Sequence, residues 1–268
     1  MYFEFKSEYG RALQTSLEWV SLFPDDTQAL LYTGRGYLFA EDPESALRVL
    51  EEGLRKGDRN PYMFFYAVLA HTATGGFEEA ERVRERGMTI HPDNSLIARA
   101  GAITAIVQGR PDRALRELEK IKGEDAALSV ELMSGDALLL KGDFRGAEDR
   151  YNRPRPLPPQ AKVRLARLAL AEGRYERAAM LAAAAADDAL VAYVEWRRGR
   201  PDECREAAKR AVQAAEKRSD FPAELEALQL KGTLEVFAGD IEAAKATAAA
   251  LRGGKKTRLE KAQARAMR

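Results

Sequence analysis

The sequence predicts an all-α protein, a solenoid of about seven to eight antiparallel helix pairs. A short sequence motif recurs along the chain. In it, a turn residue and charged residues precede a small residue. Its first four small residues are Ala12, Ala46, Ala80 and Ala114, so each step is 34 residues. Apolar residues between these positions recur at helical spacing, and no run of alternating β-branched residues predicts a strand.

Each repeat predicts two helices, and the second repeat shows how. Apolar residues recur at helical spacing over residues 30–38, which predicts a first helix. Pro43 ends that helix and begins the next, because proline is tolerated in a first helical turn. Residues 46–54 then place apolar side chains on one helical face. Glycine, asparagine and proline in residues 57–61 close the repeat.

The later repeats drift from this period. Their small residues are Ala147, Ala178, Cys204 and Ala244, at steps of 33, 31, 26 and 40 residues. Four prolines in residues 154–159 cannot continue a helix and favour a stiff connection.

Four segments follow from this pattern. We expect regular repeats in residues 1–153, a proline-rich connection in residues 154–159 and irregular Ala-rich repeats in residues 160–254. The alanines of residues 178–186 occupy several helix faces, which predicts closely packed helices. Residues 255–268 are basic and are expected to form either a capping helix or a tail.

Composition excludes several classes of protein. The 268 residues carry 43 Lys+Arg and 42 Asp+Glu, so the net charge of +1 excludes a uniformly basic binder. No apolar stretch approaches the ~20 residues of a membrane-spanning helix, so no membrane segment is expected. The first six residues lack the basic and apolar regions of an export signal, and we therefore expect a cytoplasmic protein.

Small residues also pair at a fixed distance within repeats. A glycine of the first helix precedes the small residue of the second helix by twelve residues, because close helix backbones leave room only for Gly or Ala. The pairs are Gly34 and Ala46, Gly135 and Ala147, and Gly232 and Ala244, with Tyr37 following Gly34. Over nearly the whole chain this pattern resembles the tetratricopeptide repeat family. The resemblance implies a right-handed superhelix and a non-enzymatic scaffold or adaptor that binds another protein.

The register of that family places one set of side chains on the concave groove lined by the first helices. These are Gln28, Leu31, Arg35, Tyr62, Phe65, Leu69, Arg99, Ile103, Asp136, Arg164, Arg167, Tyr193 and Arg197. Tyrosine and arginine are enriched at binding hot spots, and arginine grips carboxylates with two hydrogen bonds. The expected partner is therefore a protein or peptide segment with apolar and acidic residues. The aromatic residues have an alternative role, since they also fit packing between repeats.

Catalytic and cofactor sites are not expected. Cys204 occupies a position that alanine fills in other repeats, which favours a buried thiol over a nucleophile. His71 and His91 have no ligand or triad partner at a recognisable spacing. The Gly-Gly pairs lack the Lys and Ser/Thr of a phosphate-binding loop. We therefore predict no enzyme activity, no cofactor and no metal.

The near-neutral charge conceals an asymmetry. Residues 1–153 hold 20 Lys+Arg and 26 Asp+Glu, a net of −6, whereas residues 154–268 hold 23 and 16, a net of +7. Two alternative functions follow: RNA binding by the basic half, and self-assembly through the two oppositely charged halves. The acidic first half and the lack of a repeating pair of base-reading residues disfavour RNA.

Overall fold

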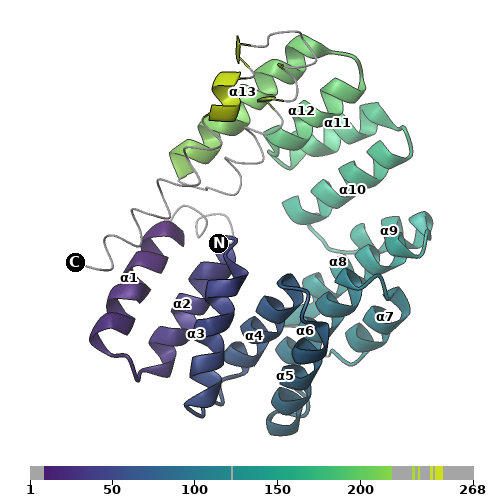
Figure 1. Cartoon of the computed structure of the whole chain (residues 1–268). Coiled ribbons are helices and arrows are strands. Elements are labelled where there is room, and N and C mark those ends of the chain that lie inside the picture. Colours follow the sequence, from purple (N-terminus) through teal and green to yellow (C-terminus); the bar gives the residue numbers. More distant parts are fainter. Residues whose placement is uncertain are drawn as a thin grey trace. The chain divides into compact units, whose positions relative to one another are not determined.

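The computed structural model describes residues 9–121 and 123–218, together with residues 231, 232, 235, 242, 243 and 245–249. The described residues contain helices and turns and no strand, which confirms the all-α prediction. The labelled helices (Figure 1) are α1 (Tyr9–Leu22), α2 (Thr27–Phe39), α3 (Pro43–Arg55), α4 (Pro61–Ala73), α5 (Phe77–Ile90), α6 (Ser95–Val107), α7 (Pro111–Glu119), α8 (Glu124–Leu140), α9 (Phe144–Tyr151), α10 (Pro159–Ala171), α11 (Tyr175–Ala184), α12 (Asp188–Arg197) and α13 (Pro201–Arg218).

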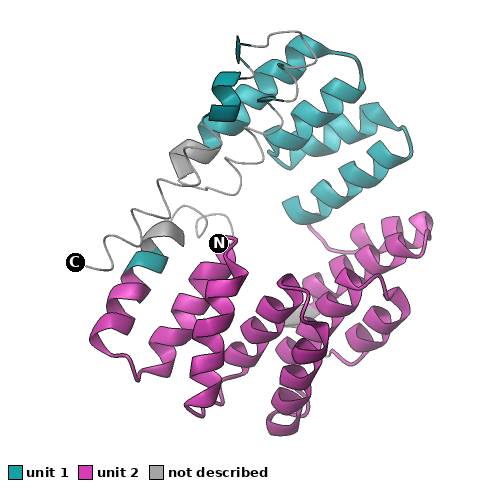
Figure 2. Cartoon of the chain, viewed as in Figure 1, with its two compact units in different colours: residues 1–14, 158–268 teal, residues 15–157 magenta. Residues whose placement is uncertain are grey.

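The chain divides into two compact units (Figure 2). Unit 2 comprises residues 15–157, and unit 1 comprises residues 1–14 and 158–268. Unit 2 contains the helix pairs α2/α3, α4/α5, α6/α7 and α8/α9, and unit 1 contains α10/α11 and α12/α13. The predictions for Ala244 and for residues 255–268 lie outside the described residues.

Prolines and side-chain caps begin several helices. Proline occupies the first turn of α3, α4, α7 and α10. Asp42 precedes α3 and accepts a hydrogen bond from the Ser45 amide at 3.0 Å. That bond satisfies one of the amides that a helix start leaves without a partner. The prediction that Pro43 begins a second helix is therefore confirmed.

The turn between the two helices of each repeat needs a left-handed residue. The structure gives positive φ to Gly75, Gly109, Gly142, Gly173 and Gly199, each five residues before the small residue of its second helix. Glycine adopts this conformation without the steric cost of a Cβ atom. The recurring turn glycine in the sequence therefore marks a backbone requirement, and Glu41 takes this position in the first of these turns, with a φ of 58°.

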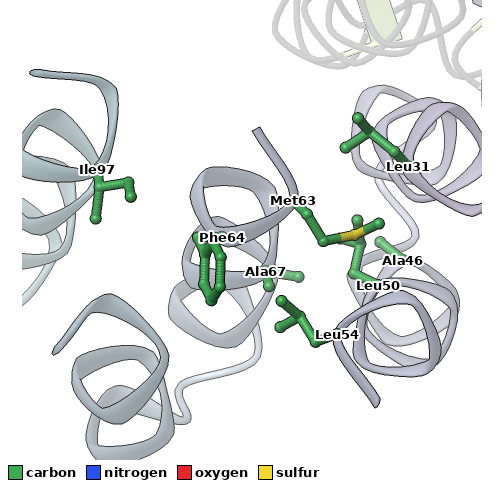
Figure 3. Packing of buried hydrophobic residues seen from close by; sticks show 9 residues of the cluster. Leu31, Ala46, Leu50, Leu54, Met63, Phe64, Ala67 and Ile97 are labelled. Atoms are coloured by element: carbon green, nitrogen blue, oxygen red, sulfur yellow. The ribbon is translucent and has the colours of Figure 1, made fainter. Parts of the chain in front are cut away.

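The core of unit 2 runs between successive repeats. Leu50 from α3 and Met63 and Phe64 from α4 are fully buried and pack with their neighbours (Figure 3). Glycine allows the closest helix approaches. A Cβ atom added at Gly34 would lie 2.4 Å from Leu50 Cγ, and one added at Gly135 would lie 2.3 Å from Tyr151 Cε1.

Two expectations about small residues need correction. Ala12 is exposed, whereas its equivalents Ala46, Ala80, Ala114, Ala147 and Ala178 are fully buried. The described residues begin at Tyr9, so the first helix against which Ala12 would pack is not among them. In residues 178–186 alanine packs on one face only, since Ala178, Ala182 and Ala185 are buried while Ala183, Ala184 and Ala186 are exposed.

Candidate functional site

The first helices of the repeats in unit 2 pack against one another in sequence. Helix α4 contacts both α2 and α6, and α6 contacts α8. We call the solvent-accessible side chains of these four helices the first-helix face. Its aromatic part comes from α2 and α4, and its two arginines, Arg35 and Arg99, come from α2 and α6.

Aromatic rings hold both of these arginines. The Arg35 guanidinium carbon lies 5.4 Å from the centre of the Phe39 ring and 6.0 Å from that of Tyr66. The Arg99 guanidinium carbon lies 5.1 Å from the centre of the Phe65 ring. The Phe65 and Tyr66 rings are 5.1 Å apart in an edge-to-face arrangement, so the two cations flank one aromatic pair.

The same two cations have no carboxylate partner among the described residues. Arg99 donates a long hydrogen bond of 3.4 Å to Ser129 Oγ, and Arg35 contacts rings only. Some arginines elsewhere in unit 2 do pair with a carboxylate: Arg82 pairs with Glu79 at 2.8 Å, and Arg150 pairs with Glu131 at 3.2 Å. Among the described side chains, the first-helix face therefore presents two guanidinium groups that aromatic rings position and no carboxylate neutralises.

The other residues predicted for the groove of unit 2 are distributed unevenly. Tyr62 is 53% exposed and its ring lies 6.4 Å from that of Tyr66, while Gln28 is also exposed. Leu31 and Phe65 are buried core residues instead, and Leu69 and Ile103 pack partly buried around Phe65. Asp136 accepts a hydrogen bond of 2.8 Å from the Tyr151 hydroxyl. Hence only part of the predicted set is available to a ligand.

The groove residues predicted from the sequence include neither Phe39 nor Tyr66. Both lie four residues beyond another member of the aromatic and arginine set, Phe39 after Arg35 and Tyr66 after Tyr62. Side chains at this spacing are neighbours on a helix surface. The spacing was the signal that could have found them.

Unit 1 carries its own cluster of aromatic residues and arginines. The Arg197 guanidinium carbon lies 5.9 Å from the centre of the Tyr175 ring, and the rings of Tyr193 and Trp196 are 5.6 Å apart. Hydrogen bonding to the hydroxyls of Tyr193 and Tyr175 raises the pKa of Arg197. On the neighbouring helix α10, Arg167 is exposed and Arg164 is half-buried.

Cys204 and the histidines occupy structural surroundings. Cys204 is fully buried and its thiol donates to the Ala192 carbonyl oxygen at 2.9 Å; burial raises the pKa of this thiol. His71 is 5% exposed, and its Nε2 lies 3.3 Å from Glu51 Oε1. Burial lowers the pKa of His71. His91 Nε2 lies 2.6 Å from the Arg59 carbonyl oxygen. Glu51 belongs to the preceding repeat, so sequence spacing did not reveal it as a partner.

Metal-binding clusters and membrane-spanning helices are both absent from the part of the chain that the structure describes. The described residues hold no group of three or more His, Cys, Asp or Glu side chains arranged to bind a metal ion. Among the same residues, no helix combines the length and apolar character needed to cross a membrane.

Comparison with known proteins identifies the architecture. No protein-family model and no curated protein matches the sequence. Among solved structures, yeast Tom70 matches with a TM-score of 0.71 and 14% identity, over 97% of this chain and 59% of Tom70, so this chain spans less than two thirds of Tom70. A human IFIT1 dimer with PPP-AAAA matches with a TM-score of 0.62 and 15% identity, over 92% of this chain and 69% of IFIT1.

A third solved structure carries the repeat in its name. A tetratricopeptide repeat protein from Parabacteroides merdae matches with a TM-score of 0.55 and 14% identity, over 90% of this chain and 99% of that one. The helix pairs, the small residues at their crossings and the left-handed turns described above agree with this likeness. The chain therefore has the helical-repeat fold of the tetratricopeptide repeat proteins.

Proposed function

We propose that this protein is a binding scaffold whose first-helix face in unit 2 holds a protein segment that carries carboxylates. The observation that supports this most strongly is the pair Arg35 and Arg99, which rest on aromatic rings and have no carboxylate partner among the described residues. A guanidinium fixed on a ring keeps its hydrogen-bond donors free at its edge.

Such a face would bind by preformed geometry. The aromatic rings restrict both arginines before the partner arrives, so little side-chain entropy is lost when a carboxylate is gripped. Exposed Tyr62 adds an apolar surface with a polar tip, which suits an aromatic or aliphatic residue beside the carboxylates. Tetratricopeptide-type helical repeats are in general non-catalytic scaffolds, and nothing in this proposal requires catalysis.

Charge variants of the two arginines test the proposal. Partners are captured from the native host and identified by mass spectrometry, and the segment they share is then synthesised for titration. We expect the double variant Arg35→Ala/Arg99→Ala to bind this peptide at least about tenfold more weakly, since hot-spot truncations commonly cost that much. Arg82→Ala removes an exposed, paired arginine and is the matched control. Equal affinity for wild type, control and double variant would refute the assignment.

Single-stranded nucleic acid is a second candidate ligand, on unit 1. Three aromatic rings and Arg197 cluster there, and stacked bases combined with arginine contacts are typical of single-strand binding. The likeness to an IFIT1 complex with PPP-AAAA adds support. Gel-shift titration with a short oligoadenylate, at low and high salt, is the test. Salt-sensitive binding lost in Tyr193→Ala/Arg197→Ala would support it, and no retention at low salt would eliminate it.

A further inference from the structure

We propose that unit 2 has a second docking surface, distinct from the first-helix face, which binds a Lys/Arg-rich amphipathic helix of another protein. We call this surface the turn edge. It consists of the four turns between first and second helices, together with the start of each second helix: residues 40–45, 74–79, 108–113 and 141–146. Val107 and Leu140, which lie just before the last two turns, also belong to it.

Direct contacts hold neighbouring turns in line. Near the ends of α4 and α6, the hydroxyl oxygens of Thr72 and Thr104 are 2.7 Å apart and buried. Between the last two turns, Lys141 Nζ donates to Asp112 Oδ1 at 2.6 Å. The second helices α5 and α7 are joined by an ion pair between Glu81 and Arg113. These contacts join the last three turns into one continuous edge, and the first turn adjoins them through the packing of α3 against α4.

One end of the turn edge is apolar and open to solvent. Val107 is 57% exposed, Leu140 is 51% exposed and Phe144 is 45% exposed. Val107 ends α6, Leu140 ends α8 and Phe144 begins α9, so all three lie beside the last two turns. Polar residues are typical of such positions. A run of large apolar side chains on an exposed edge indicates an interaction site.

The rest of the turn edge is acidic. The first two turns contain five acids, Glu41, Asp42, Glu44, Glu78 and Glu79, and no base, whereas the last two turns contain two acids, Asp112 and Asp143, and four bases, Arg110, Arg113, Lys141 and Arg145. Two of the bases, Arg113 and Lys141, already pair with acids of the protein. Glu41, Glu44 and Glu78 are exposed and form no ion pair with any described residue.

Helix ends add to this negative field. Helices α2, α6 and α8 end at the turn edge, and none of them has a basic residue in its last turn. The partial negative charge of the terminal carbonyls of α2 and α6 is therefore not offset by a basic side chain in the last turn of either helix, whereas Lys141 directly follows α8. A partner with clustered Lys and Arg would complement it, whereas an acidic partner would be repelled.

The spacing of the turns sets the length of the partner. Packed helices lie about 8–10 Å apart, so the four turns span roughly 30 Å. A helix of about 20 residues covers that distance, and residues seven apart on it are separated by about 10 Å, or one turn step. The partner helix therefore needs apolar residues seven apart at one end and Lys/Arg at the other.

Fluorescence anisotropy with designed peptides tests this surface on the full chain. The probe is a labelled 21-residue helix with two leucines seven apart at one end and four lysines at the other; a second peptide replaces each lysine with glutamate. We expect the basic peptide to bind, more tightly at low salt, and the acidic peptide to bind at least about tenfold more weakly. Val107→Glu/Leu140→Glu and, separately, Glu44→Lys/Glu78→Lys should each weaken binding about tenfold or more.

Controls separate this surface from other sites. Met180→Glu changes a still more exposed apolar residue, in unit 1, and should leave peptide binding unchanged, as should Arg35→Ala/Arg99→Ala. Equal binding of both peptides, no binding, or binding insensitive to both edge variants would overturn the proposal. Salt-sensitive self-association in sedimentation, lost in the same edge variants, would also overturn it, because the occupant would then be a second copy of the chain.

Discussion

Glu41 adopts a backbone conformation that the later repeats reserve for glycine. Its φ is 58°, whereas the equivalent positions Gly75, Gly109, Gly142 and Gly173 have φ between 66° and 80°. A left-handed residue with a Cβ atom costs about 1–2 kcal/mol, more than the ~0.5–1 kcal/mol of chain entropy that glycine loses on folding.

Replacement of this residue should therefore stabilise the protein. We expect Glu41→Gly to raise the free energy of unfolding by up to about 1 kcal/mol, measured by urea denaturation. Glu44→Gly, three residues later inside α3, is the control and should lower it by a similar amount, because glycine disfavours helix. Destabilisation by both substitutions would contradict the strain argument.

His71 makes stability depend on pH. Burial holds the pKa of the folded His71 below its usual 6.5, although Glu51 and Glu79 act in the opposite direction. The unfolded chain therefore binds more protons between the two pKa values. The stability that neutral His71 provides is present above about pH 6.5 and is lost as pH falls through the folded pKa.

This dependence is measurable by thermal unfolding. Between about pH 7.5 and pH 5, the melting temperature of the wild type should fall more steeply than that of His71→Gln, because the variant has no imidazole to protonate. His91→Gln removes the other histidine of the chain and should retain the steep slope. Parallel slopes for wild type and His71→Gln would show that this imidazole does not contribute.

At the scale of single residues, the side-chain contacts of the site were harder to predict from the sequence than the backbone conformation. Arg35 and Arg99 could be selected from the register, but their ring partners depend on contacts between repeats that helical spacing does not reveal. Phe65 illustrates the limit: it packs in the core and its ring also carries the Arg99 guanidinium, so both of its expected roles describe part of its environment.

At the scale of elements, side-chain caps determine where helices start. Asn94 precedes α6 and accepts from the amides of Leu96 and Ile97 at 3.0 and 3.1 Å. We expect Asn94→Ala to lower the free energy of unfolding by about 1 kcal/mol, since both amides then lack a protein acceptor. Asp93→Ala, at the exposed neighbouring position, should have little effect in the same denaturation assay.

The helix pairs were predictable because local chemistry and long-range packing agree. Prolines at helix starts, left-handed glycines in turns and small residues at crossings all recur with the repeat. Ala12 shows where this reasoning fails, because a repeat position is buried only if a neighbouring helix covers it. The repeat pattern predicts which small residues can pack at a helix crossing. Whether such a residue is buried depends on the presence of a neighbouring helix.

At the scale of the whole molecule, contacts between adjacent repeats confine the effect of a substitution. Gly135→Ala would place a methyl group 2.3 Å from the Tyr151 ring and should destabilise α8 and α9 by about 1–3 kcal/mol. In a stacked repeat each element contacts only its neighbours, so α2 and α3 should keep their protection. Hydrogen exchange measured by mass spectrometry would resolve this difference.

A second glycine variant provides the control. Gly76 has an ordinary φ of −77°, and a Cβ atom there would meet its nearest neighbour at 3.5 Å. Gly76→Ala should therefore leave exchange close to that of the wild type. Uniform loss of protection across unit 2 in Gly135→Ala would mean that the unit opens as a single cooperative block.

Cys204 makes the chain suitable for labelling experiments. It is the single cysteine of the sequence, and helices α12 and α13 bury its thiol completely. A thiol reagent can therefore react only when these helices separate, and the labelling rate reports the frequency of that opening. The rate of thiol labelling of the wild-type protein therefore measures how often α12 and α13 open, without an engineered probe.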